Sequence, residues 1–253
     1  MAHFFKNNSQ LILSKNHASN YAGNMIVVGG PGFGKTRGFV IPNILEGYAS
    51  YVVYDKLLEV YRATRDTLVS MGYEVKVCDF DNGDNSELDV VALCEELSTK
   101  KVAVFIKAGC SYDETSMKRK GSFIESVMEH LYDCCKKQHE TKQLDVPVAF
   151  FFDEFCSMPS LSALDKRLLE FQPYNVSFNI MCMNFSQLKL YFEKCCDYKG
   201  ESLIGQIEGV LQVGPHSICD YSYGYDIKSD IQRNQVCFGS RAGYFVDDIY
   251  ELD

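Results

Sequence analysis

The segment that most constrains the fold of this chain is a glycine-rich loop that directly follows the short apolar run Met25–Val28. The loop fits the pattern GxxxxGK[ST], and its residues are Gly29, Gly30, Pro31, Gly32, Phe33, Gly34, Lys35 and Thr36. Glycines let such a loop wrap around a phosphate with its backbone N–H groups, because side chains there would clash. A helix that begins at the lysine would direct its positive dipole end at the same anion. The pattern therefore predicts a strand, a phosphate-binding loop and a helix, in this order.

Two side chains of this loop and two later carboxylates predict the chemistry of the site. Lys35 would reach the β- and γ-phosphates of a nucleoside triphosphate, and Thr36 would offer its hydroxyl to Mg²⁺. The apolar run 148–152 ends in Asp153 and Glu154. Many strands end in acidic turns, so this pair alone is weak evidence, but the phosphate-binding loop upstream gives it meaning. We predict that Asp153 holds Mg²⁺ and that Glu154 is the catalytic base that polarises the attacking water.

The rest of the chain alternates short apolar runs with helical stretches, which predicts an α/β fold. Continuous apolar runs are typical of strands buried on both faces of a mainly parallel sheet, with helices on each side. We predict strands at 25–28, 51–54, 74–78, 102–106, 148–152, 176–181 and 209–213, with short ones at 235–238 and 244–246. We predict helices at 35–45, 59–71, 88–97, 117–137, 160–171 and 185–195. The organisation is a single domain over residues 1–253, with a lead-in at 1–20 and a core at 21–253.

Composition narrows the classes of function. The net charge is −9, so most of the surface would repel phosphates, and a general nucleic-acid coat is excluded. The densest basic run, Lys118–Lys120, is interpreted as a solvated helix face. Eleven cysteines, an odd number without metal spacing, indicate reduced thiols in the cytoplasm. No apolar run approaches the 18 residues of a membrane span, so any membrane contact is expected through partners.

Five segments resemble the TraG-like coupling proteins of conjugative type IV secretion. They are residues 24–45, 50–80, 147–161, 181–192 and 236–253, so the resemblance covers most of the chain. It implies a RecA-like P-loop NTPase fold, with ATP and Mg²⁺ as cofactors and Arg37, which follows Thr36, as part of the nucleotide-binding segment. It further implies a homo-hexameric ATPase that moves DNA or a relaxase–DNA complex and works with type IV secretion components. Such a protein would be cytoplasmic, held at the inner face of the membrane by its partners.

The chain also departs from this family. The transmembrane helices are missing, and the all-α insertion is absent around 82–101. The family's Asp-Pro-Lys-Gly-Glu reads Asp-Lys-Leu-Leu-Glu at 55–59, so its proline and glycine are gone. The stretch at 172–174 has no arginine, and the family's sensor glutamine falls at Met183 or Asn184. Arg167, Arg37 and Arg62 are the arginines considered as replacements.

These departures leave three functions open. The first is a DNA-translocating ATPase, and the second is a degenerate nucleotide-binding regulatory or structural subunit with little ATPase activity. In ring ATPases an arginine from a neighbouring subunit speeds phosphoryl transfer by orders of magnitude, so its loss favours slow turnover. The third is a small NTP-dependent enzyme such as a kinase, for which no acceptor or lid motif is found. Asp113, Glu114 and Thr115 resemble an acidic stretch of the family, but are interpreted as the N-cap of the following helix.

Overall fold

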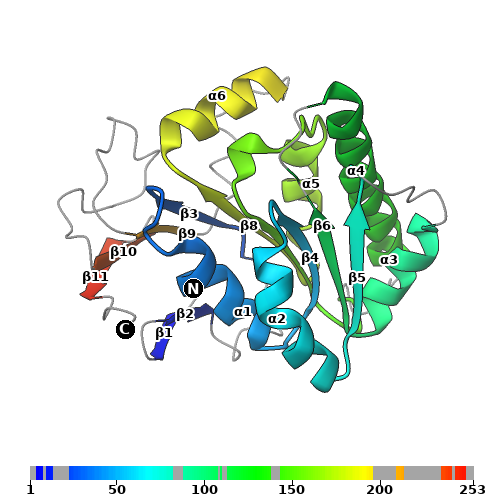
Figure 1. Ribbon diagram of the computed structural model, residues 1–253, viewed down its shortest axis with the longest axis horizontal. Coiled ribbons are helices and arrows are strands. Elements are labelled where there is room, and N and C mark those ends of the chain that lie inside the picture. Colours follow the sequence, from blue (N-terminus) through cyan, green and yellow to red (C-terminus); the bar gives the residue numbers. More distant parts are fainter. Residues whose placement is uncertain are drawn as a thin grey trace.

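The computed structural model describes residues 4–7, 10–13, 23–81, 88–107, 109, 113–137, 143–195, 209–213, 235–240 and 243–248. It contains a two-stranded hairpin and one nine-stranded sheet with helices on both faces (Figure 1). The strands are β1 (Phe4–Asn7), β2 (Gln10–Leu13), β3 (Met25–Gly29), β4 (Ser50–Asp55), β5 (Glu74–Asp79), β6 (Val102–Lys107), β7 (Val148–Phe152), β8 (Val176–Cys182), β9 (Gly209–Val213), β10 (Gln235–Ser240) and β11 (Gly243–Asp248). The helices are η2 (Lys35–Val40), α1 (Ile41–Leu45), α2 (Glu59–Ser70), α3 (Val90–Thr99), α4 (Glu114–Lys137), η3 (Phe155–Ser157), α5 (Leu164–Glu170) and α6 (Phe185–Cys195).

The strand order in the large sheet is β11-β10-β9-β3-β8-β7-β4-β6-β5. Strands β9, β3, β8, β7, β4, β6 and β5 run parallel, and β10 and β11 are added antiparallel at one edge. This confirms the predicted α/β fold with a mainly parallel sheet. Strand β8 lies between β3 and β7, so the ends of these three strands meet at one place on the sheet edge, where ligands bind in such folds.

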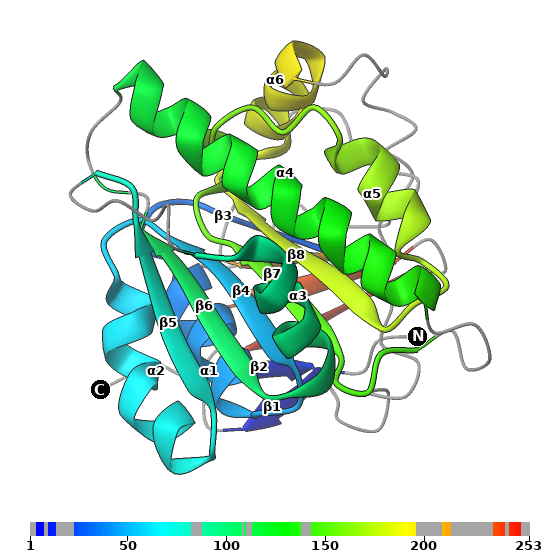
Figure 2. The same cartoon turned by 90° about the vertical axis from the view of Figure 1, so that its right-hand side faces the viewer.

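Two hydrophobic cores cover the two faces of the sheet. In β4, Tyr51 and Val53 face one core while Val52 and Tyr54 face the other, as the two-residue period of a strand requires. The first core contains Phe39 of η2, Ile44 of α1 and Leu68 of α2. The second is larger and receives buried side chains from α3, α4, α5 and α6. Figure 2 shows α3, α4 and α5 in front of the sheet, with α1 and α2 behind it. Burial on both faces explains why these strands are continuous apolar runs.

Several sequence expectations change in the structure. The lead-in at 1–20 contains the antiparallel hairpin of β1 and β2, which the sequence analysis missed. Helix α4 begins at Glu114, three residues earlier than predicted, because Asp113 caps it by accepting a hydrogen bond from the Ser116 N–H (2.8 Å). This confirms the N-cap interpretation of Asp113. Helix α5 is shorter than the predicted 160–171, since Leu161 and Ser162 lie in the turn before it.

The interpretation of Lys118–Lys120 as one solvated face is wrong for its last member. Lys118 and Arg119 are exposed, but Lys120 is fully buried. Its ammonium lies 2.7 Å from an oxygen of Asp81, which also accepts a hydrogen bond from the Ser116 hydroxyl (2.6 Å). Four residues separate Ser116 from Lys120, so both fall on the inward face of the helix. The described cysteines 78, 94, 134, 135, 156 and 182 are free thiols, as predicted.

Candidate nucleotide-binding site

The loop between β3 and η2 has the backbone that its glycines predict. Gly32 and Gly34 have φ angles of 76° and 83°, in the left-handed region that other residues rarely adopt. Gly30 makes room for a neighbouring side chain, because a Cβ there would lie 2.7 Å from the Phe33 ring and the ring would have to shift. The chain then enters η2, a short π-type helix, at Lys35. The loop therefore presents bare backbone to any ligand at its concave side.

Lys35 is folded back over this loop. Its ammonium donates hydrogen bonds to the carbonyl oxygens of Gly29 and of Gly30, the latter at 3.1 Å. Burial lowers the pKa of Lys35, although the nearby carboxylate of Asp153 acts in the opposite direction. The ammonium is thus held where the loop would wrap a phosphate, with carbonyl partners that a stronger anionic ligand would replace.

Thr36 and Asp153 meet across 117 residues of sequence. The Thr36 hydroxyl donates a hydrogen bond of 2.7 Å to an Asp153 oxygen. Asp153 follows β7, and its backbone N–H donates to the carbonyl of Tyr54 on the neighbouring strand (3.3 Å). Burial raises the pKa of Asp153 to about 6, and the charge of Glu154 adds to this rise. A hydroxyl and a carboxylate side by side are hard oxygen ligands of the kind that Mg²⁺ prefers, so these two residues fit the ion.

Glu154 has an exposed side chain and a left-handed backbone, with φ 55°. Its carbonyl accepts hydrogen bonds from the N–H and the hydroxyl of Ser157, which close the short helix η3. The Glu154 carboxylate forms an ion pair with Lys56, at 2.6 Å. On the rim, Arg37 is exposed and pairs with Glu59 at 2.9 Å.

All the predicted catalytic and metal residues line one cavity of about 720 Å³, within the range of sites that bind drug-sized ligands. Of the predicted nucleotide-binding residues, the cavity is lined by Pro31, Gly32, Gly34, Lys35, Thr36 and Arg37. Gly29, Gly30 and Phe33 build the loop behind it. The remaining lining residues are Lys56, Glu59, Asp153, Glu154, Cys156, Ser157, Met181, Cys182, Met183 and Gln187.

Gln187 was missed in the sequence analysis. It lies in the first turn of α6 and lines the cavity. Helix α6 follows β8, the strand between β3 and β7. Its side-chain oxygen is buried and has no hydrogen-bond partner among the described residues. Asn184, considered for the sensor position, instead accepts a hydrogen bond from the Gln187 N–H (2.8 Å) and caps the helix. A glutamine one turn beyond the end of β8 is the sequence signal that points to it.

The three candidate replacement arginines lie in different surroundings. Arg167 is buried, pairs with Glu170 at 2.6 Å and lies over the Tyr132 ring, so its guanidinium is held within its own chain. Arg62 is exposed on α2 and is not part of the cavity lining. Arg37 lines the cavity from its rim.

Comparison with known proteins agrees with this geometry. A family model described as Type IV secretory system conjugative DNA transfer matches residues 4–115 and 93–206. A search of curated proteins found no match. No helix in the described part of the chain is both long enough and apolar enough to cross a bilayer.

Solved structures share the fold at low sequence identity. The bacterial conjugative coupling protein TrwBdeltaN70 matches with a TM-score of 0.55 and 10% identity, over 98% of this chain and 94% of its own. The plasmid coupling protein TrwB in complex with the GTP analogue GDPNP gives a TM-score of 0.52 and 10% identity, over 99% and 95%. The DNA-packaging ATPase B204 from Sulfolobus Turreted Icosahedral Virus gives 0.50 and 12%, over 92% and 100%. The fold is therefore that of RecA-like P-loop ATPases, and the chain belongs to the conjugative DNA transfer family of type IV secretory systems.

Proposed function

We propose that this protein binds ATP with Mg²⁺ and hydrolyses it to move DNA, or a relaxase–DNA complex, toward a type IV secretion apparatus. The observation that carries the proposal is the convergence of Lys35, Thr36, Asp153 and Glu154 on one cavity beside the glycine loop. Membership of a DNA-transfer family supports the nature of the cargo. The proposed protein works in the cytoplasm as a homo-hexamer. Components of the secretion apparatus bring it to the membrane.

Each residue has a defined role in this reaction. The loop N–H groups and Lys35 bind the phosphates, and the lysine exchanges its two carbonyl partners for phosphate oxygens. Thr36 and Asp153 would hold Mg²⁺, which supplies positive charge beside the phosphates. Glu154 accepts a proton from the attacking water while the bond between the γ-phosphorus and the bridging oxygen breaks, giving ADP and phosphate.

A second function is favoured by one specific contact. The Glu154 carboxylate is paired with Lys56, so the proposed base is engaged by a cation. Together with the buried Arg167, this contact favours a nucleotide-binding subunit with little turnover. The two functions differ in the expected rate of hydrolysis and agree on nucleotide binding.

One set of assays separates them. ATP binding and hydrolysis are measured for the wild-type protein and for Lys35→Ala, each with and without single-stranded DNA. Hydrolysis that DNA stimulates supports the motor, whereas nucleotide binding without stimulated hydrolysis supports the regulatory subunit. Lys35→Ala should abolish binding; retained binding would remove the nucleotide site from both functions. Lys166→Ala, an exposed lysine on α5 outside the cavity, is the matched control.

The oligomeric state is tested by the solution mass of the protein with and without ATP and Mg²⁺. A sixfold increase on nucleotide addition supports the hexamer. A monomer under all conditions would contradict the ring.

A further inference from the structure

Lys56 and Glu154 lie in the turns that follow two neighbouring parallel strands, β4 and β7. Tyr54 of β4 pairs in register with Phe152 of β7, and in both segments the paired residue is followed by an aspartate and then by Lys56 or Glu154. The register therefore brings the Lys56 ammonium to the Glu154 carboxylate, at 2.6 Å. Both side chains line the same cavity as Lys35. The contact follows from the sheet itself rather than from a loop that happens to fold over.

This ion pair adds little to the stability of the fold. The two side chains are 32% and 50% exposed, and such pairs are strongly weakened by water and salt. The ion pair instead affects the Glu154 carboxylate, which would accept the proton of the attacking water. In the Asp-Pro-Lys-Gly-Glu pattern of the TraG-like family, a proline stands at position 56, and a proline carries no charge.

The cavity has few cations for the charge that develops during phosphoryl transfer. Among its described lining residues they are Lys35, Arg37 and Lys56. Lys35 serves the loop, and Arg37 is 73% exposed and pairs with Glu59 on the rim. Lys56 is the cation beside Glu154, where the attacking water and the outermost phosphate would meet. Positive charge at that point stabilises the transition state.

We infer that Lys56 is the γ-phosphate-recognising residue of this site, and that it exchanges Glu154 for the γ-phosphate when ATP binds. The inference deepens the proposed function and rests on it. In the structure the ammonium holds the Glu154 carboxylate. When a γ-phosphate is present, its oxygens take the ammonium, and the released carboxylate accepts a proton from the attacking water. The oxygen–phosphorus bond to water forms as the bond to the ADP oxygen breaks. Lys56 keeps its protons throughout and contributes charge.

The test is the discrimination between a triphosphate and a diphosphate. Affinities for ADP and for a non-hydrolysable ATP analogue, each with Mg²⁺, are measured for the wild type, Lys56→Met and Lys56→Arg. Lys118→Met is the matched control, because Lys118 also pairs with a glutamate at 2.6 Å but lies exposed on α4. Lys56→Met should weaken binding of the analogue about tenfold and leave ADP binding within about twofold. The kcat of Lys56→Met should fall roughly 10- to 100-fold. Lys56→Arg should keep most of the analogue affinity and most of the kcat that Lys56→Met loses.

Three results overturn the inference. Equal affinities for the analogue in wild type and Lys56→Met would remove γ-phosphate recognition. Equal weakening of ADP and analogue would indicate a structural role. An unchanged or higher kcat in Lys56→Met would make the lysine only a restraint on Glu154. The proposed function fails differently, because the wild type would then bind neither nucleotide, and the inference would fall with it.

Discussion

At the scale of single residues, burial of the Asp153 carboxylate lowers the stability of the fold, whereas the same carboxylate can bind a cation. Its carboxylate is buried, which raises its pKa to about 6, against 3.8 for the free side chain. Because the folded pKa lies above the unfolded one, the native state binds this proton more tightly. The contribution of Asp153 to stability therefore falls as the pH rises from about 4 to about 6, by roughly 2–3 kcal/mol at most. A bound cation would recover this cost.

Asp153→Asn should consequently stabilise the metal-free protein while removing its response to Mg²⁺. The asparagine oxygen still accepts the Thr36 hydrogen bond, and no buried charge remains. We expect a gain of about 1–2 kcal/mol in the free energy of unfolding at pH 7.5, and none at pH 4. Urea unfolding in EDTA at the two pH values measures it. A variant that is less stable than the wild type at pH 7.5 would show that the carboxylate is already compensated.

Gln187 should show a similar opposition between stability and activity. Its buried side-chain oxygen has no partner among the described residues, and a buried acceptor of this kind costs about 1–3 kcal/mol. Gln187→Leu keeps the approximate shape, so the protein should gain about 1 kcal/mol, while kcat falls about tenfold because the cavity loses the polar side chain of Gln187. Thermal unfolding and steady-state hydrolysis measure the two effects. Gln172→Leu, at an exposed position, is the control, and equal effects in both variants would argue against a role for the cavity.

At the scale of elements, the junction of β5 and α4 depends on the Asp81–Lys120 pair. Burial alone would raise the pKa of Asp81, but hydrogen bonds from Lys120 and Ser116 bring it below its usual value. Removal of one partner takes an opposite charge away from the other in the interior.

Asp81→Ala should therefore cost more than Lys120→Met. The first leaves a fully buried ammonium without this carboxylate and should destabilise the protein by about 3 kcal/mol, whereas the second replaces the ammonium with an apolar side chain of similar length and should cost about 1–2 kcal/mol. Chemical denaturation at neutral pH ranks the two variants. The reverse order would mean that Asp81 is solvated well enough to be dispensable.

Most elements of this fold can be predicted from the sequence, and the exceptions have physical reasons. The central strands are continuous apolar runs because both faces are covered, and such runs are conspicuous. The hairpin of β1 and β2 is too short to be distinguished from an irregular lead-in. Position 58 adopts a left-handed backbone, with φ 57°, although it is a leucine. This is the position of the glycine in the family's pattern, so the leucine adopts a backbone that glycine takes more readily.

The site divides in the same way. Lys35, Thr36, Asp153 and Glu154 are predictable because their spacing in sequence reflects a loop and a strand end. The interaction partners of these residues cannot be predicted in this way, because contacts between segments distant in sequence determine them. Lys56 meets Glu154 across 98 residues through the register of two strands, and the burial of Arg167 and Lys120 depends on how helices rest on the sheet.

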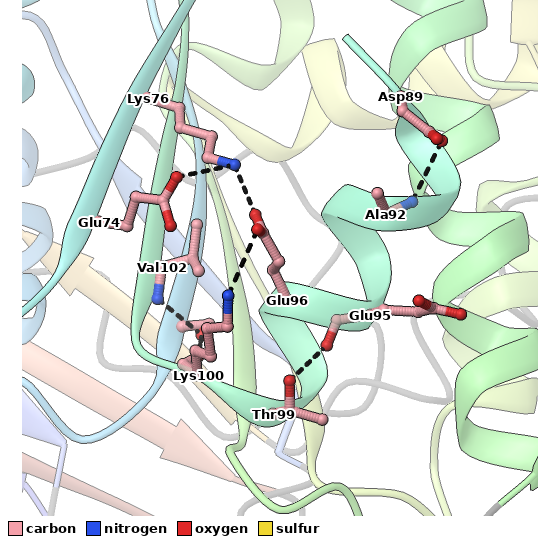
Figure 3. A network of polar contacts seen from close by, with 10 residues as sticks. Glu74, Lys76, Asp89, Ala92, Glu95, Glu96, Thr99, Lys100 and Val102 are labelled. Carbon is pink, nitrogen blue, oxygen red and sulfur yellow. Dashed lines mark hydrogen bonds and ion pairs between the residues drawn. The ribbon is translucent and has the colours of Figure 1, made fainter.

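At the scale of the whole molecule, the two edges of the large sheet differ. One edge continues through the antiparallel strands β10 and β11, while the other ends at β5. Strand β5 has mixed exposure, with the apolar Val77 open to solvent. In Figure 3, Lys76 of this strand lies between Glu74 and Glu96 and forms ion pairs with both. Charges on an edge strand oppose its pairing with another chain.

Lys76→Val should therefore promote self-association without changing the nucleotide site. The substitution places an apolar residue beside Val77 and removes the lysine of β5, so Glu74 and Glu96 each lose one of their cations. We expect more light scattering on incubation at 37 °C, with nucleotide affinity unchanged. Lys100→Val, which also removes a partner of Glu96 but lies after α3, is the control. Equal scattering for the wild type and Lys76→Val would show that the edge is protected by other means.

The matched register of β4 and β7 also limits how this protein can change over evolution. A substitution at Lys56 or Glu154 alters one side chain, but an insertion of one residue in either strand reverses which face every later residue points to. In β4 it would carry Lys56 away from Glu154, and in β7 it would also move Asp153 away from Thr36. Length changes are therefore expected in the loops between these strands in related sequences, while the strands themselves keep their lengths even where their residues differ.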